Sequence, residues 1–303
     1  METLRQILDP HFLLRNSVYV SMLVGFACPL AGIYLILRRL IFMGVALPQI
    51  SSAGIAFAFC LPALGLAGHM HLGHFEGDER LLAFAGGLSF TLAAILFLAV
   101  LERRGRGSVE GRIGTLYALA GAWSILLLVK NPMGERGLLD LLRGEIITVS
   151  DLDLWLTLAT FVVVALALFL FKKEFLLVSF DRDMAVTLKK NVLLWDCLLF
   201  LLIGLTISMA VLSVGPLVTF GFLLIPPLIA HLFAHNMRQF ALAASAVGGL
   251  SALAGFYAAY RWDYPVGPTD VALLGVVYGL LFLGRKLYRL PRTKRPASAA
   301  RTG

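Results

Sequence analysis

Long apolar stretches separated by short polar connections run through almost the whole chain, and this pattern constrains the fold more than any other feature. Most stretches reach the roughly 20 residues that a helix needs to cross about 30 Å of hydrocarbon. Two are shorter or interrupted by Gly and Pro, so eight or nine transmembrane helices are expected. The sequence therefore predicts an all-α membrane protein, a polytopic bundle of 8–9 transmembrane helices. The stretches lie near residues 14–36, 45–66, 81–101, 113–129, 154–171, 194–212, 215–233, 238–260 and 268–284.

Composition leaves no room for a soluble domain of useful size. Of the 303 residues, 59% are apolar and 15% are charged, and the longest connections span only about 20 residues. We expect one transmembrane domain over residues 1–290 and a basic tail over residues 291–303. Cys28, Cys60 and Cys197 all lie within predicted spans, which favours small packing residues over disulfides.

The positive charge of the connections alternates from one to the next. One alternate set holds 19 of the 26 Lys and Arg residues; it includes residues 37–44, 102–112, 172–193 and the tail from Arg285. Because cytoplasmic loops are enriched in Lys and Arg, we expect this set inside, with the N-terminus outside and the C-terminus cytoplasmic. The net charge of +8 then indicates attraction to anionic membrane lipid, and the scattered basic residues give no sign of nucleic-acid binding.

The interiors of the predicted spans are almost free of ionisable side chains. Lys130 and Asp196 lie near span ends, where they can reach the interface. Carriers driven by ion binding usually place a carboxylate or a His near mid-membrane, so the pattern disfavours a secondary transporter. The chain also lacks a GxxxxGK[ST] phosphate-binding loop and a nucleophile–base arrangement. We therefore predict no enzyme, no catalytic residue and no cofactor; energy for active transport must come from another polypeptide.

The inside connection at residues 172–193 has the features of a short docking helix. Ser179 or Asp181 can cap it, Asp183 suits its first turn, and the basic pair at 189–190 suits its last. Met184, Ala185 and Leu188 are then expected to share one face. The pattern predicts an amphipathic helix that binds a cytosolic partner; a solvated connection along the lipid headgroups is the alternative.

Polar and helix-breaking residues indicate where a substrate could pass. In the second span, Gln49 and Ser52 share a face with Val45 and Ala56 and are its only strongly hydrogen-bonding groups. A second broken element begins at Gly215-Pro216 and continues to Pro226-Pro227. Interrupted helices are typical of transport pathways. The alternatives are a Gln that bonds to a neighbouring helix and kinks that serve packing.

One outside connection is rich in possible metal ligands. His69, His71 and His74 are followed by Glu76 and Asp78, and such a set could hold a divalent metal. The connection is short and Gly-rich, which favours an ordinary solvated loop. We therefore assign no metal ligand.

Five segments in order along the chain resemble one family of transport proteins. Together they cover roughly residues 12–285 and resemble the permease subunits of bacterial zinc/manganese/iron ABC importers. The segments are Arg38-Arg39 with MGVALPQISSAGIA at 43–56, GLLDLLRGEI at 137–146, F-D-x-x-x-A-x-x-L at 180–188, VGPLV at 214–218 with IPPLIA at 225–230, and DYPVGPT at 263–269.

The chain departs from the family pattern at its chemical centre. The family's M-G-D-A-x-S-H segment carries an Asp and a His implicated in handling the cation; here these positions are Val45 and Gln49, and Pro48 replaces the intervening Ser. Val offers no donor atom, and a neutral amide is a poorer zinc ligand than imidazole. The resemblance therefore supports fold and energy coupling more strongly than it supports a zinc cargo.

The resemblance implies a permease subunit of an ATP-binding-cassette importer in the bacterial cytoplasmic (inner) membrane, with divalent metal ions such as zinc, manganese or iron as cargo. Its implied partners are cytosolic ABC ATPase subunits, an extracytoplasmic solute-binding protein and a second permease copy in a homodimer. Two alternatives stay open: the same architecture carrying a non-metal or chelated substrate, and a non-transporting membrane scaffold. The expected ATPase-coupling residues are Phe180, Asp181, Met184, Ala185 and Leu188. The expected path residues are Gln49, Ser52, Gly215 and Pro226.

Overall fold

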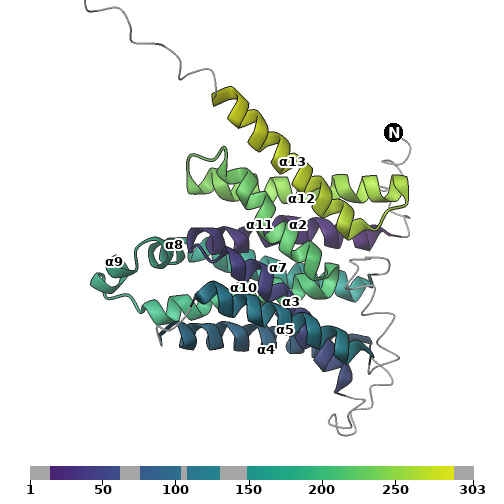
Figure 1. Ribbon diagram of the computed structural model, residues 1–303, viewed down its shortest axis with the longest axis horizontal. Helices are drawn as coiled ribbons and strands as arrows, with labels where there is room; N and C mark the ends of the chain where they lie inside the picture. Colours follow the sequence, from purple (N-terminus) through teal and green to yellow (C-terminus); the bar gives the residue numbers. More distant parts are fainter. Residues whose placement is uncertain (1–13, 62–75, 104–107, 130–148, 290–303) are drawn as a thin grey trace, which may run out of the picture.

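The computed structural model describes residues 14–61, 76–103, 108–129 and 149–289, and every regular element in these ranges is a helix. Nine long helices and two short ones follow one another along the chain (Figure 1). The helices are α2 Arg15–Leu37, α3 Ile41–Cys60, α4 Glu76–Arg103, α5 Val109–Val129, α7 Asp151–Leu170, α8 Lys172–Phe180, α9 Arg182–Thr187, α10 Val192–Val214, α11 Pro216–His231, α12 Met237–Trp262 and α13 Val266–Arg289.

The all-α membrane architecture predicted from the sequence is confirmed. Seven of the described helices, namely α2, α3, α4, α7, α10, α12 and α13, are long and apolar enough to cross a membrane. The helix α11 is apolar but has only 16 residues, and α5 covers the predicted span at 113–129. The expected total of eight or nine membrane crossings stays a prediction.

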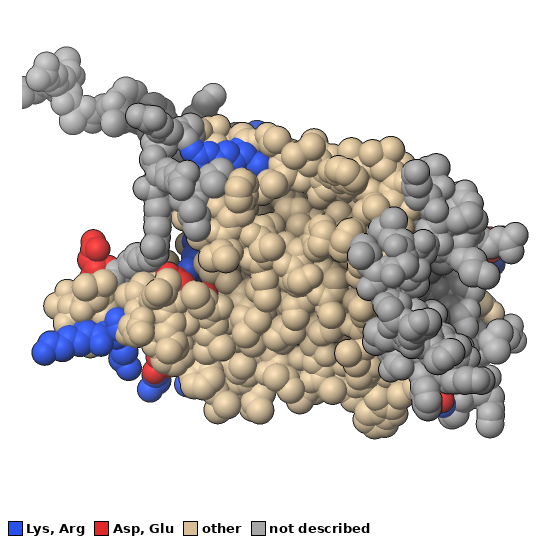
Figure 2. All heavy atoms as spheres, turned by 90° about the horizontal axis from the view of Figure 1, so that it is seen from below, with Lys and Arg blue, Asp and Glu red and all other residues tan. Residues whose placement is uncertain are grey.

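The bundle has a buried centre and an apolar exterior. The helices α2, α3, α10 and α11 carry many of the buried side chains, whereas α4, α5, α7 and α13 present large apolar residues such as Trp155 and Phe169 at the surface. Figure 2 shows a broad face without Lys, Arg, Asp or Glu in the middle of the molecule, with charged side chains at the end that carries α8 and α9. A surface of this kind suits contact with lipid rather than water.

Small residues let the helices approach backbone to backbone. A Cβ atom added to Gly25 of α2 would lie 2.7 Å from the carbonyl oxygen of Gly248 in α12. A Cβ atom added to Gly54 of α3 would lie 2.4 Å from the carbonyl oxygen of Gly86 in α4. Close contacts between small residues are a main way in which helices associate within a bilayer.

The predicted interruption at Gly215 is confirmed. Gly215 has a φ of 83°, a conformation that residues with a side chain rarely adopt, and it separates α10 from α11. Pro216 then occupies the first turn of α11, where its missing N–H costs no helical hydrogen bond. Pro226 and Pro227 lie inside α11, which continues through them.

The alternating connections gather at opposite ends of the bundle. Figure 1 shows the α2–α3 and α11–α12 connections at the same end as α8 and α9, and the α12–α13 connection at the other end. Arg38, Lys189 and Lys190 belong to the first end, whereas Arg80 and Arg261 belong to the second. The fold thus brings together the connections that the charge pattern assigns to one side.

Candidate coupling helix and translocation path

The helix α8 is anchored by aromatic side chains. It follows α7 after a break at Phe171, and the fully buried Phe175 lies at its centre. The ring of Phe175 makes edge contacts with Tyr34 of α2 at 6.0 Å and with Trp195 of α10 at 5.8 Å between centroids. These contacts attach α8 to two central helices.

The helix α9 begins with one of the two caps that the sequence offered. The backbone N–H of Met184 donates to Asp181 Oδ1 at 2.9 Å, so Asp181 is the N-cap residue. Asp183 lies in the first turn, as expected. The helix ends at Thr187, and the Lys pair expected in its last turn lies just beyond it. Lys189 has a φ of 55°, in the left-handed region.

Four of the five predicted coupling residues, all except Ala185, are at the surface of this segment, and three of these four are apolar. Phe180 is 65% exposed, Met184 52% and Leu188 53%. Val186, which the sequence analysis did not single out, is similarly exposed at 61%. We call these four exposed apolar residues, which lie near Lys189 and Lys190, the α9 patch.

Ala185 does not belong to the α9 patch. It is fully buried and packs in a small cluster with Val178 of α8 and Val192 of α10. The expectation that Met184, Ala185 and Leu188 would form one docking face is therefore wrong for Ala185. Helical spacing alone does not say which side of a short helix packs against the rest of its own protein. The position of Ala185 instead seats α9 on α8 and α10.

A buried ion pair lies directly beneath α8. Arg38 Nη1, at the end of α2, lies 2.7 Å from Asp196 Oδ1 in α10, and each side chain is only 12% exposed. Arg38 Nε also donates to Ser179 Oγ of α8 at 3.0 Å. The sequence analysis expected Asp196 to reach the membrane interface, whereas the structure places it in this ion pair. Arg38 and Asp196 are too far apart in the chain for local spacing to predict their contact.

The predicted path residues lie on α3, α10 and α11, but their surroundings differ. Gln49 is half-buried and faces α5, where a Cβ atom added to Gly121 would lie 3.4 Å from Gln49 Nε2. Ser52 is buried, and so are Gly215 and Pro226. The helices that carry them do touch, because Leu224 of α11 packs against α3 at Gly44. Their role in transport stays a prediction.

One polar contact in the centre of the bundle was missed. Ser51 Oγ of α3 donates to Ser208 Oγ of α10 at 3.4 Å, and both side chains are fully buried. A Cβ atom added to Gly87 of α4 would lie 2.8 Å from Ser51 Oγ, so three helices meet at this point. The sequence analysis named the adjacent Ser52 as a path residue and did not single out Ser51.

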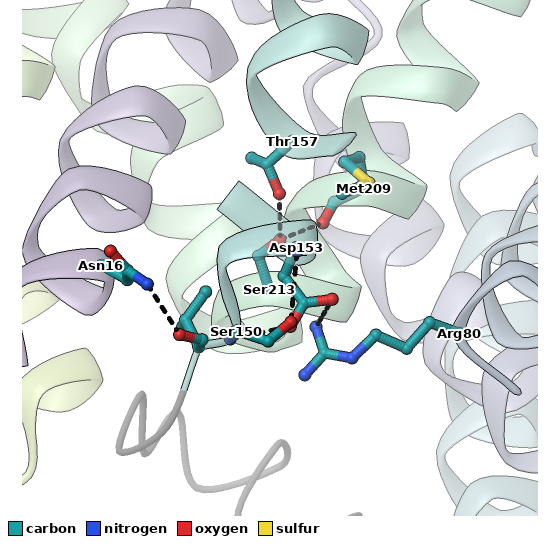
Figure 3. Close-up of polar contacts among 8 residues, drawn as sticks. Asn16, Arg80, Ser150, Asp153, Thr157, Met209 and Ser213 are labelled. Carbon is teal, nitrogen blue, oxygen red and sulfur yellow. Dashed lines mark hydrogen bonds and ion pairs between the residues drawn. The ribbon is translucent and has the colours of Figure 1, made fainter. Parts of the chain in front are cut away.

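A polar cluster joins four helices at the opposite end from α9 (Figure 3). Ser150 and Asp153 form a capping box at the start of α7, in which Ser150 Oγ donates to Asp153 Oδ2 at 2.6 Å. Asp153 Oδ1 also pairs with Arg80 Nη1 of α4. Asn16 Nδ2 of α2 donates to the carbonyl oxygen of Val149 at 3.1 Å.

The same cluster reaches the end of α10. Thr157, one turn along α7, lies with its Oγ1 3.4 Å from Ser213 Oγ, as Figure 3 shows. Ser213 Oγ in turn donates to the carbonyl oxygen of Met209. These contacts fix α7 against α2, α4 and α10 at this end of the bundle.

Asp270 is a buried carboxylate that sequence reasoning missed. It lies in the first turns of α13 and is fully buried, and Ser21 Oγ of α2 donates to its Oδ2 at 3.3 Å. Gly255 of α12 leaves the space that Asp270 fills, because a Cβ atom there would lie 1.9 Å from Asp270 Oδ1. Asp270 thus connects α2, α12 and α13. The sequence places it only two residues inside a predicted span, so it was not recognised as buried.

Within the described ranges, no group of three or more His, Cys, Asp and Glu side chains is arranged to hold a metal ion. His69, His71 and His74 of the candidate outside loop lie outside the described residues, as does the 137–146 segment. The structure therefore assigns no resident metal site to the chain's described part.

Comparison with known proteins identifies the family. The sequence pattern of the ABC 3 transport family matches residues 11–284, which is most of the chain. The chain belongs to the ABC 3 transport family. It is 25% identical over 281 residues to the manganese import system permease protein ScaB of Streptococcus gordonii, covering 93% of this chain and 94% of that protein. It is 26% identical over 270 residues to the manganese transport system membrane protein MntC of Listeria monocytogenes, covering 89% and 90%.

A solved structure supports the fold of this ABC 3 family member. PsaBC from Streptococcus pneumoniae in complex with Fab superposes with a TM-score of 0.78 at 23% identity, covering 93% of this chain and 94% of that one. The resemblance to metal-type ABC importer permeases, inferred from five short motifs, is thereby confirmed. The relatives are permease and membrane proteins of transport systems, in agreement with the interpretation as a transport subunit rather than an enzyme.

Proposed function

We propose that this ABC 3 family permease is the membrane-spanning subunit of an importer for divalent metal ions, with Mn²⁺ as the first candidate cargo. A separate cytosolic ATPase would power it, an extracytoplasmic solute-binding protein would deliver the cargo, and a second copy of the chain would complete the path. The bacterial inner membrane is its expected location, with the N-terminus outside. The names of the relatives support manganese as cargo.

The α9 patch is the observation that carries the coupling part of this proposal. Phe180, Met184, Val186 and Leu188 are exposed apolar side chains, and α9 projects from the end of the bundle that gathers most Lys and Arg residues (Figure 1). Exposed apolar residues on a short, capped helix outside the expected hydrocarbon region suit a groove in a soluble partner. Nucleotide-driven movement of that partner would then displace α8 and α9 and rock the spans.

The proposed path is lined by α3 and α11. Gly215 interrupts the helical path between α10 and α11, and Gln49 offers an amide on the half-buried face of α3 that faces α5. A neutral amide oxygen is acceptable to a hard cation such as Mn²⁺ but a weak ligand for Zn²⁺. The path would therefore let the ion pass without holding it tightly.

A chelated or non-metal cargo is the second candidate. It is favoured by one observation, namely that Val45 and Gln49 give the half-buried face of α3 no charged metal ligand. Uptake of Mn²⁺ by cells that express the complete complex separates the two candidates. ATP-dependent accumulation of free Mn²⁺ that falls on Gln49→Leu substitution supports the metal ion, whereas absence of accumulation from free Mn²⁺ contradicts it.

The coupling surface is tested by placing a charge within the α9 patch. We expect Met184→Glu and Leu188→Glu each to lower copurification of the ATPase subunit by about tenfold, because a carboxylate would be buried without a partner in the interface. Phe233→Glu is the matched control, since Phe233 is equally exposed at 54% and lies at the same end, in the α11–α12 connection. Unchanged copurification and uptake in both α9 variants would contradict this function.

A further inference from the structure

We propose that Arg38 is a positioning residue that transmits the displacement of α8 and α9 to the central helices α2 and α10. The inference rests on the proposed function, because it requires a cytosolic motor that moves α9. Beyond that function, Arg38 would be the contact that passes the movement of α8 and α9 to the membrane-spanning helices. Arg38 is the contact because one side chain reaches all three helices.

The geometry of Arg38 is that of a three-way junction. Its Nη1 atom lies 2.7 Å from Asp196 Oδ1 of α10, and its Nε atom donates to Ser179 Oγ of α8 at 3.0 Å. The guanidinium also lies 5.3 Å from the centroid of the Phe200 ring, one turn further along α10. A planar guanidinium with several fixed N–H groups can make these contacts together, which the single ammonium of a Lys cannot.

Burial makes this junction stiff. The side chains of Arg38 and Asp196 are each 12% exposed, so water screens their attraction only weakly. Separating two charges in such a place is costly, since each would be left without its counter-charge. When α8 is displaced, moving α2 and α10 with it therefore costs less free energy than breaking the ion pair.

The neighbouring contacts direct movement through the same point. On one side, Ala185 seats α9 against Val178 and Val192, so a push on the α9 patch reaches α8 directly. On the other side, α2 touches α11 backbone to backbone, since a Cβ atom added to Gly32 would lie 1.7 Å from the carbonyl oxygen of Leu223. A rigid contact of this kind passes a shift of α2 on to α11, next to the proposed path.

The decisive experiment measures cargo moved per ATP hydrolysed by the complete complex. The main variant is the double substitution Arg38→Gln/Asp196→Asn, which removes both charges together and leaves neither one unpaired. We expect ATPase copurification and ATP hydrolysis to stay within about twofold of the unsubstituted complex, while Mn²⁺ uptake per ATP falls about tenfold. A merely structural role would lower the amount of complex and leave this ratio unchanged.

A milder variant keeps the test decisive if the double variant does not accumulate. Ser179→Ala removes only the hydrogen bond between α8 and Arg38, and we expect it to lower uptake per ATP by about threefold. Arg39→Gln is the matched control, because Arg39 is the adjacent residue of the same type and is exposed. The control should leave the ratio unchanged.

The outcomes separate this inference from the proposed function. An unchanged ratio of uptake to hydrolysis in Ser179→Ala and in every double-variant complex obtained overturns the role of Arg38 while leaving the importer function intact. A complex of the unsubstituted chain that hydrolyses ATP without accumulating Mn²⁺ overturns manganese import, and with it the inference.

Discussion

Single glycines decide how closely the helices of this bundle approach. Gly32 of α2 lies against the backbone carbonyl of Leu223 in α11, and a carbonyl within a helix cannot swing aside as the end of a long side chain can. The contact therefore depends on the absence of a single methyl group. Gly279 of α13 is the opposite case, because an added Cβ atom would meet nothing within 4 Å there.

Gly32→Ala should accordingly destabilise the protein. The added Cβ atom would lie 1.7 Å from the Leu223 oxygen, and relieving the overlap by moving α2 from α11 should cost about 1–3 kcal/mol. The expected result is a lower midpoint of thermal unfolding for the detergent-purified chain. Gly279→Ala is the control and should leave the midpoint unchanged or slightly raise it, since Ala is the better helix former. An equal midpoint for both variants would contradict the close contact.

Residue-level patterns in the sequence predicted local features better than long-range contacts. The break at Gly215 and the cap at Asp181 each depend on one residue type and its immediate neighbours. The break was predicted, and Asp181 was one of two predicted caps, with Ser179 as the alternative. The contact of Ser21 with Asp270 joins residues 249 positions apart, and no local spacing indicates it. Local pattern accordingly suggested candidate coupling residues but gave no indication of the Arg38–Asp196 ion pair.

At the scale of elements, α9 is the described helix that depends most on contacts with the rest of the protein for its stability. It has six residues, too few for a helix to be stable in water by itself. It is ordered by two features at its ends and one on its inner face, namely the Asp181 cap, the left-handed turn at Lys189 and the burial of Ala185. Periodicity predicted a short helix here but not which face packs inward, because a single turn has no second turn to define an apolar side.

Removal of the cap should loosen α9 without affecting the rest of the bundle. Asp181→Ala leaves the N–H of Met184 without its side-chain acceptor and should destabilise α9 by about 1 kcal/mol. We expect faster amide hydrogen exchange at residues 184–187 and weaker copurification of the ATPase. Asp183→Ala is the control, because Asp183 lies in the same turn but is not the cap. Equal exchange in the two variants would show that the cap does not order α9.

At the scale of the whole molecule, charge and topology agree. The sequence divides the connections into a set rich in Lys and Arg and a set poor in them. The described connections of the two sets lie at opposite ends of the bundle (Figure 1). Each end has its own ion pair, Arg38 with Asp196 at one and Arg80 with Asp153 at the other. Periodicity and charge were sufficient to predict this architecture, since lipid allows few alternatives to a helical bundle.

Orientation in the membrane follows from this division and can be tested with single cysteines. Cells favour Lys- and Arg-rich loops on the cytoplasmic side, so the end carrying α9 should face the cytosol and the α12–α13 connection should face out. In a Cys197→Ser background, an impermeant maleimide added to intact cells should label Tyr264→Cys at once but Lys189→Cys only after permeabilisation. Both positions are exposed in the structure, and the other native cysteines, Cys28 and Cys60, are buried. Immediate labelling of Lys189→Cys would place α9 outside, beyond the reach of any cytosolic ATPase.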